Sequence, residues 1–438
     1  MCILLRGGKV FANKKITTRD VVLSNGQIKL ENTKSIKCDE VVNIDGLYIV
    51  PGFVDIHVHG YKGFEFINGI YDSVKNNFDN SRGAYEKGFA DFTKNLVKSG
   101  VTGAYLGTYA VPIDVLENAF ARLADVMDNQ KAKLSGTRIL GGFIEGSFIN
   151  KEMCGAQNPE YVLEPEISIF KKINQRGVIK LVLVAPENPK AIDLITYLDS
   201  IEVRVGAGHC KATADDIKNA MNAGLRYFVH FLNGRTTQSF KSFDGGGAVE
   251  AVLQNDIYAE LILDGIHVSG QYVREVIARK GIDRVIGITD AIFPAGTNFK
   301  TVSLGGICGQ VSEKGDYIHV QGDKGKLFSS MLSMDKGFEN LLNWFTSEMP
   351  GVWHKKHEEF SLEEAIGTAV QLCSKNPNDL MGRAGYGEIK DGAAADICVL
   401  NIGGKAGDYN IKVAKTFIDG ILVFDSNLSA KDKSTRDD

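Results

Sequence analysis

The sequence predicts an α/β protein, a (β/α)8 TIM barrel with a small β-sandwich domain built from both chain ends. The main observation is a series of eight apolar, β-rich runs, most of them separated by helix-patterned stretches. Eight such units over about 240 residues match a closed barrel in number and in size. A second observation is that both chain ends carry short strand patterns joined by Asn-Gly or Asp-Gly turns.

The composition is typical of a globular enzyme. The chain has 438 residues, 44% of them hydrophobic and 24% charged, and the usual domain size of about 100–200 residues predicts two or three domains. A formal net charge of -4 provides no basic surplus for nucleic acid or an anionic membrane. The N-terminal apolar run is too short for a signal peptide, and no segment approaches the roughly 18 apolar residues of a membrane span. We therefore expect a cytoplasmic protein without nucleic-acid or membrane partners.

The two chain ends are predicted to form one small domain. In residues 1–50, Asn25-Gly26 lies between two short strand patterns, which is typical of a β-hairpin. Residues 385–426 repeat this pattern around Asp-Gly turns. Because neither end has enough strands to cover its own apolar face, we expect the two to pair. Residues 427–438 read as a flexible, solvated tail.

Residues 51–384 are predicted to form the catalytic barrel. Residues 89–100 and 214–224 have helical patterns and precede the second and the sixth apolar run. An open doubly wound sheet is the alternative, but it would usually have fewer strands and a glycine-rich phosphate loop after the first, which the sequence lacks. The eight predicted strand units are 48–58, 101–110, 138–148, 177–187, 202–210, 226–233, 257–268 and 284–291.

The seven cysteines form an odd and irregular set without a CxxC pair, scattered from Cys2 to Cys398. Such a set is typical of reduced thiols in a reducing compartment. We expect all seven to be unpaired residues of the core or the surface.

Polar residues gather where the predicted strands end, which is where barrel enzymes carry their chemistry. Five of the eight histidines of the chain occupy such positions. A single histidine at a strand end is more often structural than a ligand, but imidazoles and carboxylates that converge on one barrel mouth suit a divalent metal. The strand-end set is His57, His59, Glu145, His209, His230, His267 and Asp290.

Six motifs in chain order resemble the amidohydrolase superfamily and, within it, the N-acetylglucosamine-6-phosphate deacetylases. They are the HxH after PGF, the Glu in GGFIEGSFIN, the His in AGHCKAT, the His-x-x-Asn in VHFLNG, DGIHV and the Asp in GITDA. The resemblance runs from residue 1 to about residue 425 and includes the split β-domain. It implies hydrolysis of the acetamide of an N-acetylated amino sugar, with N-acetylglucosamine 6-phosphate as the expected substrate.

The resemblance also implies a role for each strand-end residue. Glu145, His209 and His230 would hold a principal metal, and His57 and His59 a second one, with zinc expected first and iron, cobalt or manganese as alternatives. Asp290 would be the catalytic acid and base as well as a metal ligand. His267 would contact the substrate and help to stabilise the oxyanion.

Further positions are implied to contact the sugar, and several of them depart from the family pattern. Gln157 replaces a histidine, Arg235 follows Asn233-Gly234 where the family has another run, and Phe328 enters a loop that is usually lined by small residues. The implied substrate-binding set is Gln157, Asn233, Gly234, Arg235, Lys241, His267, Leu327, Phe328 and Ser329. Family members are homodimers, so we expect a homodimer here as well.

Two other classes of function stay open at this stage. One is another amidohydrolase activity, on a non-phosphorylated N-acyl amino sugar or another N-acyl amine. Many such enzymes bridge two metals with a carboxylated lysine at the end of strand 4, but Lys180 lies near the start of that strand. The other is a catalytically silent scaffold, which would normally have lost metal ligands. We rank both below the deacetylase.

The predicted phosphate contact gives a first test. An ungapped count from His230 places Lys241 where the family has an arginine that binds the sugar phosphate. Lysine binds phosphate as a point charge, without the planar fork of arginine, and Arg235 could supply that fork. We expect a 6-phosphorylated N-acetylhexosamine to be preferred over its unphosphorylated form. Lys241→Ala should raise KM for the phosphorylated sugar and leave kcat nearly unchanged, because the contact is remote from the amide. Equal turnover of both sugars, unaffected by the substitution, would contradict this prediction.

Overall fold

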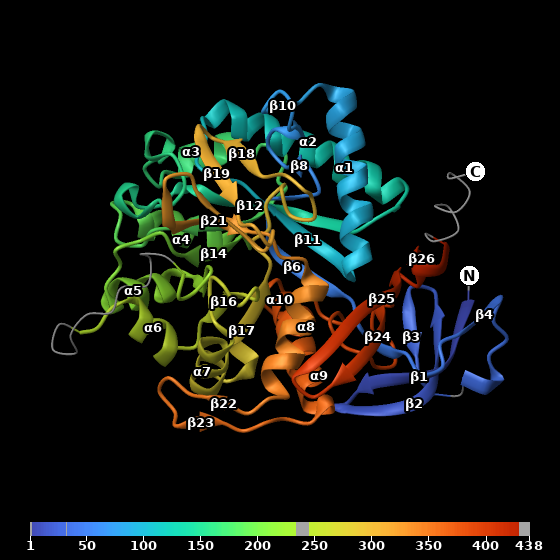
Figure 1. The fold of residues 1–438 in the computed structure, drawn as a ribbon. Helices are drawn as coiled ribbons and strands as arrows, with labels where there is room; N and C mark the ends of the chain where they lie inside the picture. The colour runs from blue at the N-terminus through green and yellow to red at the C-terminus, as the bar shows by residue number, and fades with distance from the viewer. Residues whose placement is uncertain (1, 32, 234–244, 429–438) are drawn as a thin grey trace.

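The computed structural model describes residues 2–31, 33–233 and 245–428 (Figure 1). Its central element is a sheet of eight parallel strands, each adjacent to the next along the chain, which confirms the predicted barrel. Their burial fits a barrel, since all residues of the first two strands are buried. The eight strands are β6 (Phe53–Val58), β11 (Val101–Gly107), β12 (Arg138–Phe148), β13 (Ile179–Val184), β14 (Arg204–Ala207), β15 (Leu225–Phe228), β16 (Tyr258–Ile262) and β17 (Val285–Ile288).

Backbone hydrogen bonds join the last strand unit to the first. The Asp290 amide donates to the His57 carbonyl at 2.9 Å, and the His59 amide donates to the Ala291 carbonyl at 2.9 Å. Val58 and Ala291 also form a parallel bridge. The closure therefore brings the end of the first strand directly beside the residues that follow the eighth.

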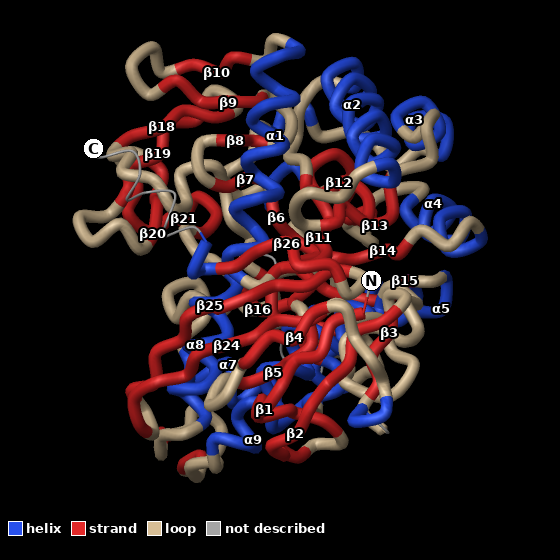
Figure 2. Tube along the Cα trace, turned by 90° about the vertical axis from the view of Figure 1, so that its right-hand side faces the viewer, coloured by secondary structure: helices blue, strands red, loops and turns tan. Residues whose placement is uncertain are grey.

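Helices alternate with the barrel strands and lie on their outer side (Figure 2). The two helices predicted before the second and the sixth strand are confirmed as α1 and α5. None of the helices within the described ranges combines the length and apolar character that a membrane span requires. The helices are α1 (Arg82–Leu96), α2 (Ile113–Ala132), α3 (Ile167–Ile173), α4 (Ala191–Ser200), α5 (Ala214–Ala223), α6 (Ala248–Gln254), α7 (Gly270–Lys280), α8 (Met334–Phe345), α9 (Leu362–Val370) and α10 (Asn376–Leu380).

The chain ends pair into one eight-stranded sheet, as predicted (Figure 1). The strand just before the barrel, β5, pairs with N-terminal strand β1 on one side and with C-terminal strand β24 on the other. Apolar residues from both ends share a single core on this sheet. Its strands are β1 (Cys2–Ala12), β2 (Lys15–Ser24), β3 (Gln27–Lys29), β4 (Glu40–Asn43), β5 (Tyr48–Pro51), β24 (Ile397–Lys405), β25 (Asp408–Ile418) and β26 (Ile421–Asp425).

Two tight turns of this domain were readable from the sequence. Asn25 and Gly26 connect β2 to β3 with φ values of 53° and 73°, and Asp419 and Gly420 connect β25 to β26 with φ values of 51° and 74°. Two successive residues with positive φ are the mark of the hairpin turn that Asn-Gly and Asp-Gly favour. Each dipeptide therefore sets the register of its hairpin.

Sequence reasoning missed two small antiparallel sheets inserted into the barrel, although Gly305-Gly306 is a dipeptide typical of a hairpin turn. One follows β6 and the other follows β17, and their apolar side chains share a cluster that includes Tyr71, Phe293 and Phe328. Both inserts extend the side of the barrel where the strands end. Their strands are β7 (Gly60–Tyr61), β8 (Phe64–Glu65), β9 (Gly69–Asp72), β10 (Asn77–Asp79), β18 (Thr301–Leu304), β19 (Ile307–Val311), β20 (Tyr317–Val320) and β21 (Asp323–Ser330).

The prediction that all seven cysteines are unpaired is wrong for two of them. Cys2 and Cys38 form a disulfide, with their Cα atoms 4.7 Å apart. The two meet because β4 runs parallel to β1, so that Ile3 pairs with Glu40 and the segment before β4 lies beside the start of β1. Their separation of 36 residues carries no local pattern from which this pairing could be read. The other five cysteines are thiols.

Candidate metal centre

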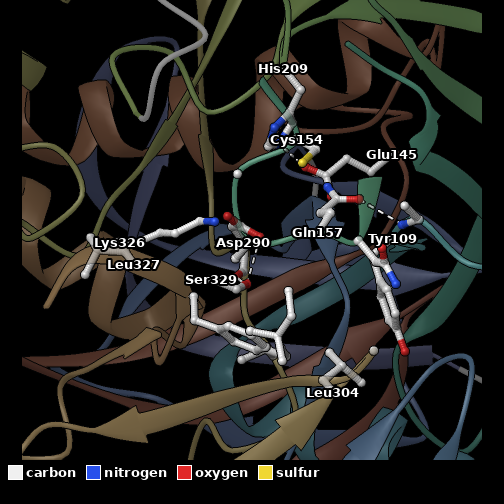
Figure 3. Close-up of a pocket in the computed structure, with 18 of the residues that line it drawn as sticks. Tyr109, Glu145, Cys154, Gln157, His209, Asp290, Leu304, Lys326, Leu327 and Ser329 are labelled. Carbon is white, nitrogen blue, oxygen red and sulfur yellow. Dashed lines mark hydrogen bonds and ion pairs between the residues drawn. The ribbon is translucent and has the colours of Figure 1, made fainter. Parts of the chain in front are cut away.

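Six of the seven predicted strand-end residues converge at one end of the barrel. Figure 3 shows three of them, Glu145, His209 and Asp290. His57 and His59 lie at the end of β6, and Glu145 lies within β12. His209, His230 and Asp290 each follow the last residue of their strand by two residues. The carboxyl ends of parallel strands meet on the same side of a barrel, which is why residues far apart in the sequence lie together.

Glu145 is the centre of one half of this cluster. Its Oε1 atom lies 3.2 Å from His209 Nε2 and 3.1 Å from His230 Nε2. The two histidine Nε2 atoms are themselves 3.1 Å apart. Three potential ligand atoms therefore surround one small volume.

The other half of the cluster joins the HxH pair to Asp290. His59 Nε2 lies 3.2 Å from Asp290 Oδ1 and 3.8 Å from Glu145 Oε2. His57 Nε2 lies 3.7 Å from Asp290 Oδ1 and 3.7 Å from Glu145 Oε1. Glu145 thus stands between two groups of ligands, as a carboxylate shared by two metal ions would.

Neighbouring groups fix which nitrogen of each imidazole carries the proton. The Nδ1 atom of His59 lies 3.1 Å from the Gly107 carbonyl, and that of His209 lies 2.9 Å from the Met153 carbonyl. A carbonyl only accepts, so each Nδ1 donates and each Nε2 keeps a free lone pair in the neutral ring. The Nδ1 atom of His57 donates in the same way to a carboxylate oxygen of Glu260, at 2.9 Å.

This arrangement fits a divalent cation. The Nε2 lone pairs face carboxylates that also only accept, and the buried His57 Nε2 has no hydrogen-bond partner among the described residues. Such a convergence of acceptors is repulsive unless protons or a cation lie between them. Two groups of three residues have the spacing of metal ligands, and Glu145 belongs to both. One group adds His57 and His59, and the other adds His209 and His230. Nitrogen and oxygen donors of this kind suit zinc and its divalent neighbours.

The ionisation of the cluster follows from the same contacts. Burial lowers the pKa of His57, but the charges of Glu260 and Asp290 outweigh burial and raise this pKa to about 10. Burial would raise the pKa of Glu145, yet its hydrogen bonds from His209 and His230 hold it well below the usual range. The protein without metal therefore favours carboxylates beside a protonated His57, whose proton must leave when a metal binds. Burial lowers the pKa of His230 and so favours its neutral form.

Three of the six residues adopt backbone conformations that are rare outside glycine. The φ values are 45° at His209, 28° at His230 and 50° at Asp290. Positive φ at a residue with a Cβ atom is strained, and such strain is found mainly at functional sites. Here each strained residue lies just after a barrel strand, where the unusual turn directs its side chain over the barrel mouth.

The cluster lies at the base of a cavity of about 640 Å³. Five of the residues predicted to contact substrate line this cavity: Gln157, Asn233, Leu327, Phe328 and Ser329. The first two come from loops after β12 and β15, and the last three belong to the insert strand β21. The cavity walls therefore come from loops and inserts, whereas its base comes from strand ends.

Two of these residues also contact the metal-binding carboxylates. Gln157 Nε2 donates to Glu145 Oε2 at 3.0 Å, while its Oε1 accepts from the Ala110 amide at 2.8 Å. The Ser329 hydroxyl lies 3.0 Å from Asp290 Oδ1 and also contacts the Asp290 carbonyl. Both side chains therefore hold these carboxylates in position, in addition to lining the cavity.

Four predicted residues are not placed against this cavity. His267 Nδ1 donates to Asp264 Oδ2 at 2.6 Å, its side chain is 1% exposed, and it is absent from the described lining. Its role in substrate contact stays a prediction. Gly234, Arg235 and Lys241 lie outside the described residues.

Sequence reasoning missed Glu260. Its side chain is fully buried in β16, where it contacts His57 and accepts from the His230 amide at 3.3 Å. The available signal was an acidic residue inside the apolar run IYAELILD. A buried carboxylate needs such partners, so an acidic residue in the middle of a barrel strand is a candidate site residue.

A second histidine and carboxylate group, formed by Glu275, His354 and His357, lies elsewhere in the structure. Glu275 Oε1 already accepts from the amides of Val352, Trp353 and His354, at 2.5 to 3.1 Å. Its Oε2 pairs with His354 Nδ1 at 2.5 Å. The carboxylate is therefore engaged in holding the 352–357 loop and has little capacity left for an ion.

Comparison with known proteins places this geometry in a family. The amidohydrolase family profile matches residues 48–423, which include the barrel and every residue of the cluster. The chain belongs to the amidohydrolase family. This amidohydrolase also has curated relatives that cover nearly its whole length.

Two of these relatives are N-acetylglucosamine-6-phosphate deacetylases. The protein from Lysinibacillus sphaericus is 26% identical over 386 residues, which cover 87% of this chain and 89% of that protein. The protein from Vibrio furnissii is 26% identical over 431 residues, covering 98% and 95%. An N-acetylgalactosamine-6-phosphate deacetylase from Escherichia coli O157:H7 is 26% identical over 369 residues, covering 83% and 86%.

Solved structures share the fold. The N-acetyl-D-glucosamine-6-phosphate deacetylase of Mycobacterium smegmatis, in complex with N-acetyl-D-glucosamine-6-phosphate, superposes with a TM-score of 0.77. The identity is 21%, and the match covers 96% of this chain and 99% of that one. This likeness confirms a barrel with an attached β-domain.

Removal of a ligand should remove the metal. In Glu145→Ala or His209→Ala, we expect the purified protein to lose most of its divalent metal, because one lost ligand also leaves the others badly placed. Metal content per chain, measured by elemental analysis, checks this. His354→Ala is the matched control, since it removes an imidazole from the separate Glu275 group. Full metal retention in both ligand variants would overturn the assignment.

Glu260 should raise the metal affinity of the site without being a metal ligand itself. Glu260→Gln keeps the size of the side chain but removes the charge that orients His57, so metal affinity should fall by about 10- to 100-fold. A competition titration with a chelator measures this affinity. Glu202→Gln, at an exposed position before β14, should leave it unchanged. An unaltered affinity in Glu260→Gln would show that His57 does not depend on this carboxylate.

Proposed function

We propose that this amidohydrolase removes the acetyl group of an N-acetylated amino sugar, converting N-acetylglucosamine 6-phosphate and water into glucosamine 6-phosphate and acetate. The observation that carries the proposal is the convergence of imidazole lone pairs around the shared carboxylate Glu145 at the base of the cavity. The near full-length relatives that deacetylate sugar phosphates support the choice of substrate.

The metal-binding groups divide into two sets in this proposal. Glu145, His209 and His230 would hold the principal ion, and His57 and His59 would complete a second site with Glu145. When bound, such an ion polarises a carbonyl as a Lewis acid and lowers the pKa of a water ligand toward neutrality. Burial of His57, His59, Glu145 and His230 keeps bulk water from competing for these four side chains.

Asp290 is the proposed acid and base. It is 6% exposed, lines the cavity and lies beside both halves of the cluster. Burial would raise the pKa of Asp290, but the positive charge on His57 and the contact with His59 hold it below the usual value. The carboxylate is therefore ready to take a proton from the attacking water and to deliver it to the amide nitrogen as the C–N bond breaks.

Substrate contacts are proposed for the cavity walls. Asn233 and the 327–329 segment lie where a bound sugar would touch both sides of the cavity. Gly234, Arg235 and Lys241 complete the proposed set on the basis of sequence alone. His267 is proposed to assist at the oxyanion, which would require its Nε2 atom to face the substrate.

Another amidohydrolase activity is the alternative, on an unphosphorylated N-acyl sugar or another N-acyl amine. The replacement of a sugar-contacting histidine by Gln157 favours a changed sugar. The N-acetylgalactosamine-6-phosphate deacetylase among the relatives shows that similar sequences serve a different epimer. The reacting amide and its metal site would be the same in each case.

Three finer points belong to the proposal. Zinc is the proposed ion because a set of histidines and a carboxylate suits it. A homodimer is proposed from the sequence resemblance, and a cytoplasmic location from the five cysteines that are thiols.

Substrate profiling tests the proposal. Phosphorylated and unphosphorylated N-acetylglucosamine and N-acetylgalactosamine should be assayed for acetate release, with metals quantified in the same preparation. We expect the highest kcat/KM for N-acetylglucosamine 6-phosphate, loss of activity after chelation and recovery with Zn²⁺. Absence of acetate release from all four sugars by the metal-loaded protein would refute the proposal.

Asp290→Asn should separate chemistry from binding. Asparagine keeps the shape but cannot accept the proton, so kcat should fall by at least about 100-fold. KM should change little if the sugar is held by the cavity walls. Turnover of the metal-loaded variant, measured as acetate release, checks this. A near-normal rate would mean that another group is the base.

A further inference from the structure

The wall of the cavity carries one cationic side chain that the predicted site did not include. Lys326 belongs to β21 and is the single lysine or arginine among the described residues that line the cavity. Figure 3 shows its side chain extending from the insert toward the side of the cavity that carries Asp290. Its neighbours Leu327, Phe328 and Ser329 line the same wall.

No carboxylate among the described residues neutralises Lys326. Many lysines of the structure form an ion pair within 4.0 Å, but the half-buried Lys326 forms none with a described residue. The rim carboxylate Glu152 pairs instead with Lys211, at 2.5 Å. Asp323 Oδ1 accepts from the Gly325 amide at 3.0 Å. Lys326 therefore presents an unused positive charge to the cavity.

The two carboxylates at the base of the cavity do not neutralise the charge of Lys326. Glu145 and Asp290 are engaged with imidazoles and, in the proposed function, with metal ions. The charge of Lys326 also acts across the cavity on Cys154, where it partly offsets the effect of burial, which raises the pKa of that thiol. An ammonium group in a partly enclosed site is stabilised by an anion that replaces the water it has lost.

We propose that Lys326 is a specificity-determining residue that binds the anionic substituent of the substrate and so selects a phosphorylated sugar over a neutral one. The inference rests on the proposed function, because it assigns the phosphate of that substrate to a described residue. It adds an anion contact on the β21 side of the cavity to the one predicted for Lys241. A long, flexible lysine suits this role, since it reaches the phosphate as a point charge without fixed geometry.

The test compares Lys326→Met, which keeps the length of the side chain but not its charge, with Lys326→Arg. Lys324→Met is the matched control, because Lys324 lies on the same strand, is exposed and does not line the described cavity. For the metal-loaded enzyme, we expect Lys326→Met to raise KM for N-acetylglucosamine 6-phosphate about tenfold or more, with kcat nearly unchanged. KM for unphosphorylated N-acetylglucosamine should not rise, Lys326→Arg should largely restore the preference, and Lys324→Met should match the wild type.

A binding measurement separates this inference from the proposed function. Glucose 6-phosphate and glucose, which carry no amide, should be titrated calorimetrically into the metal-loaded proteins. We expect Lys326→Met to bind glucose 6-phosphate at least about tenfold more weakly, whether or not any sugar is deacetylated. If KM and binding are unchanged, Lys326 is a solvated wall residue and the inference is wrong. If kcat falls equally for both acetylated sugars, Lys326 acts at the amide, which also overturns it.

Discussion

The structure depends on one constraint: acceptor atoms from the ends of four other strands must be held close to Glu145. His209 and His230 each approach the same carboxylate oxygen within 3.2 Å, although 64 and 85 residues separate them from it along the chain. Left alone, lone pairs at these distances repel one another. Only a closed barrel with a packed interior is rigid enough to hold them together until a cation or protons neutralise them.

Hydrogen-bonding groups around the cluster fix the orientation of its imidazoles. Glu260 and the carbonyls of Gly107 and Met153 bind the outer nitrogens of three imidazoles and so direct their inner lone pairs to one volume. Strained backbone at His209 and Asp290 serves the same end. The surrounding apolar core stabilises these unfavourable features, which is the usual relation between a scaffold and its active site.

Chemistry and recognition have separate structural origins in this protein. The metal-binding groups come from the barrel strands, whose positions every barrel must keep. The cavity walls come from loops and from the insert that ends in β21, which supplies Lys326, Phe328 and Ser329. Phe328 packs in the apolar cluster shared by the two inserts. The inserts can therefore differ between relatives without disturbing the strand-end cluster, which agrees with relatives that are named for different epimers.

The sequence by itself determined the barrel, the split β-domain and six of the strand-end residues that the barrel brings together as a candidate metal centre. Strand periodicity, turn dipeptides such as Asn25-Gly26 and polar residues at strand ends are local signals, and local signals survive in a linear sequence. The tertiary structure decided what depends on distant contacts: the Cys2–Cys38 disulfide, the packing of the two inserted sheets against each other, the contact of Glu260 with His57, and the place of Lys326 in the cavity wall, where it has no ion pair among the described residues. Each of these arises from chain segments that meet only after folding, so no spacing in the sequence could have revealed it.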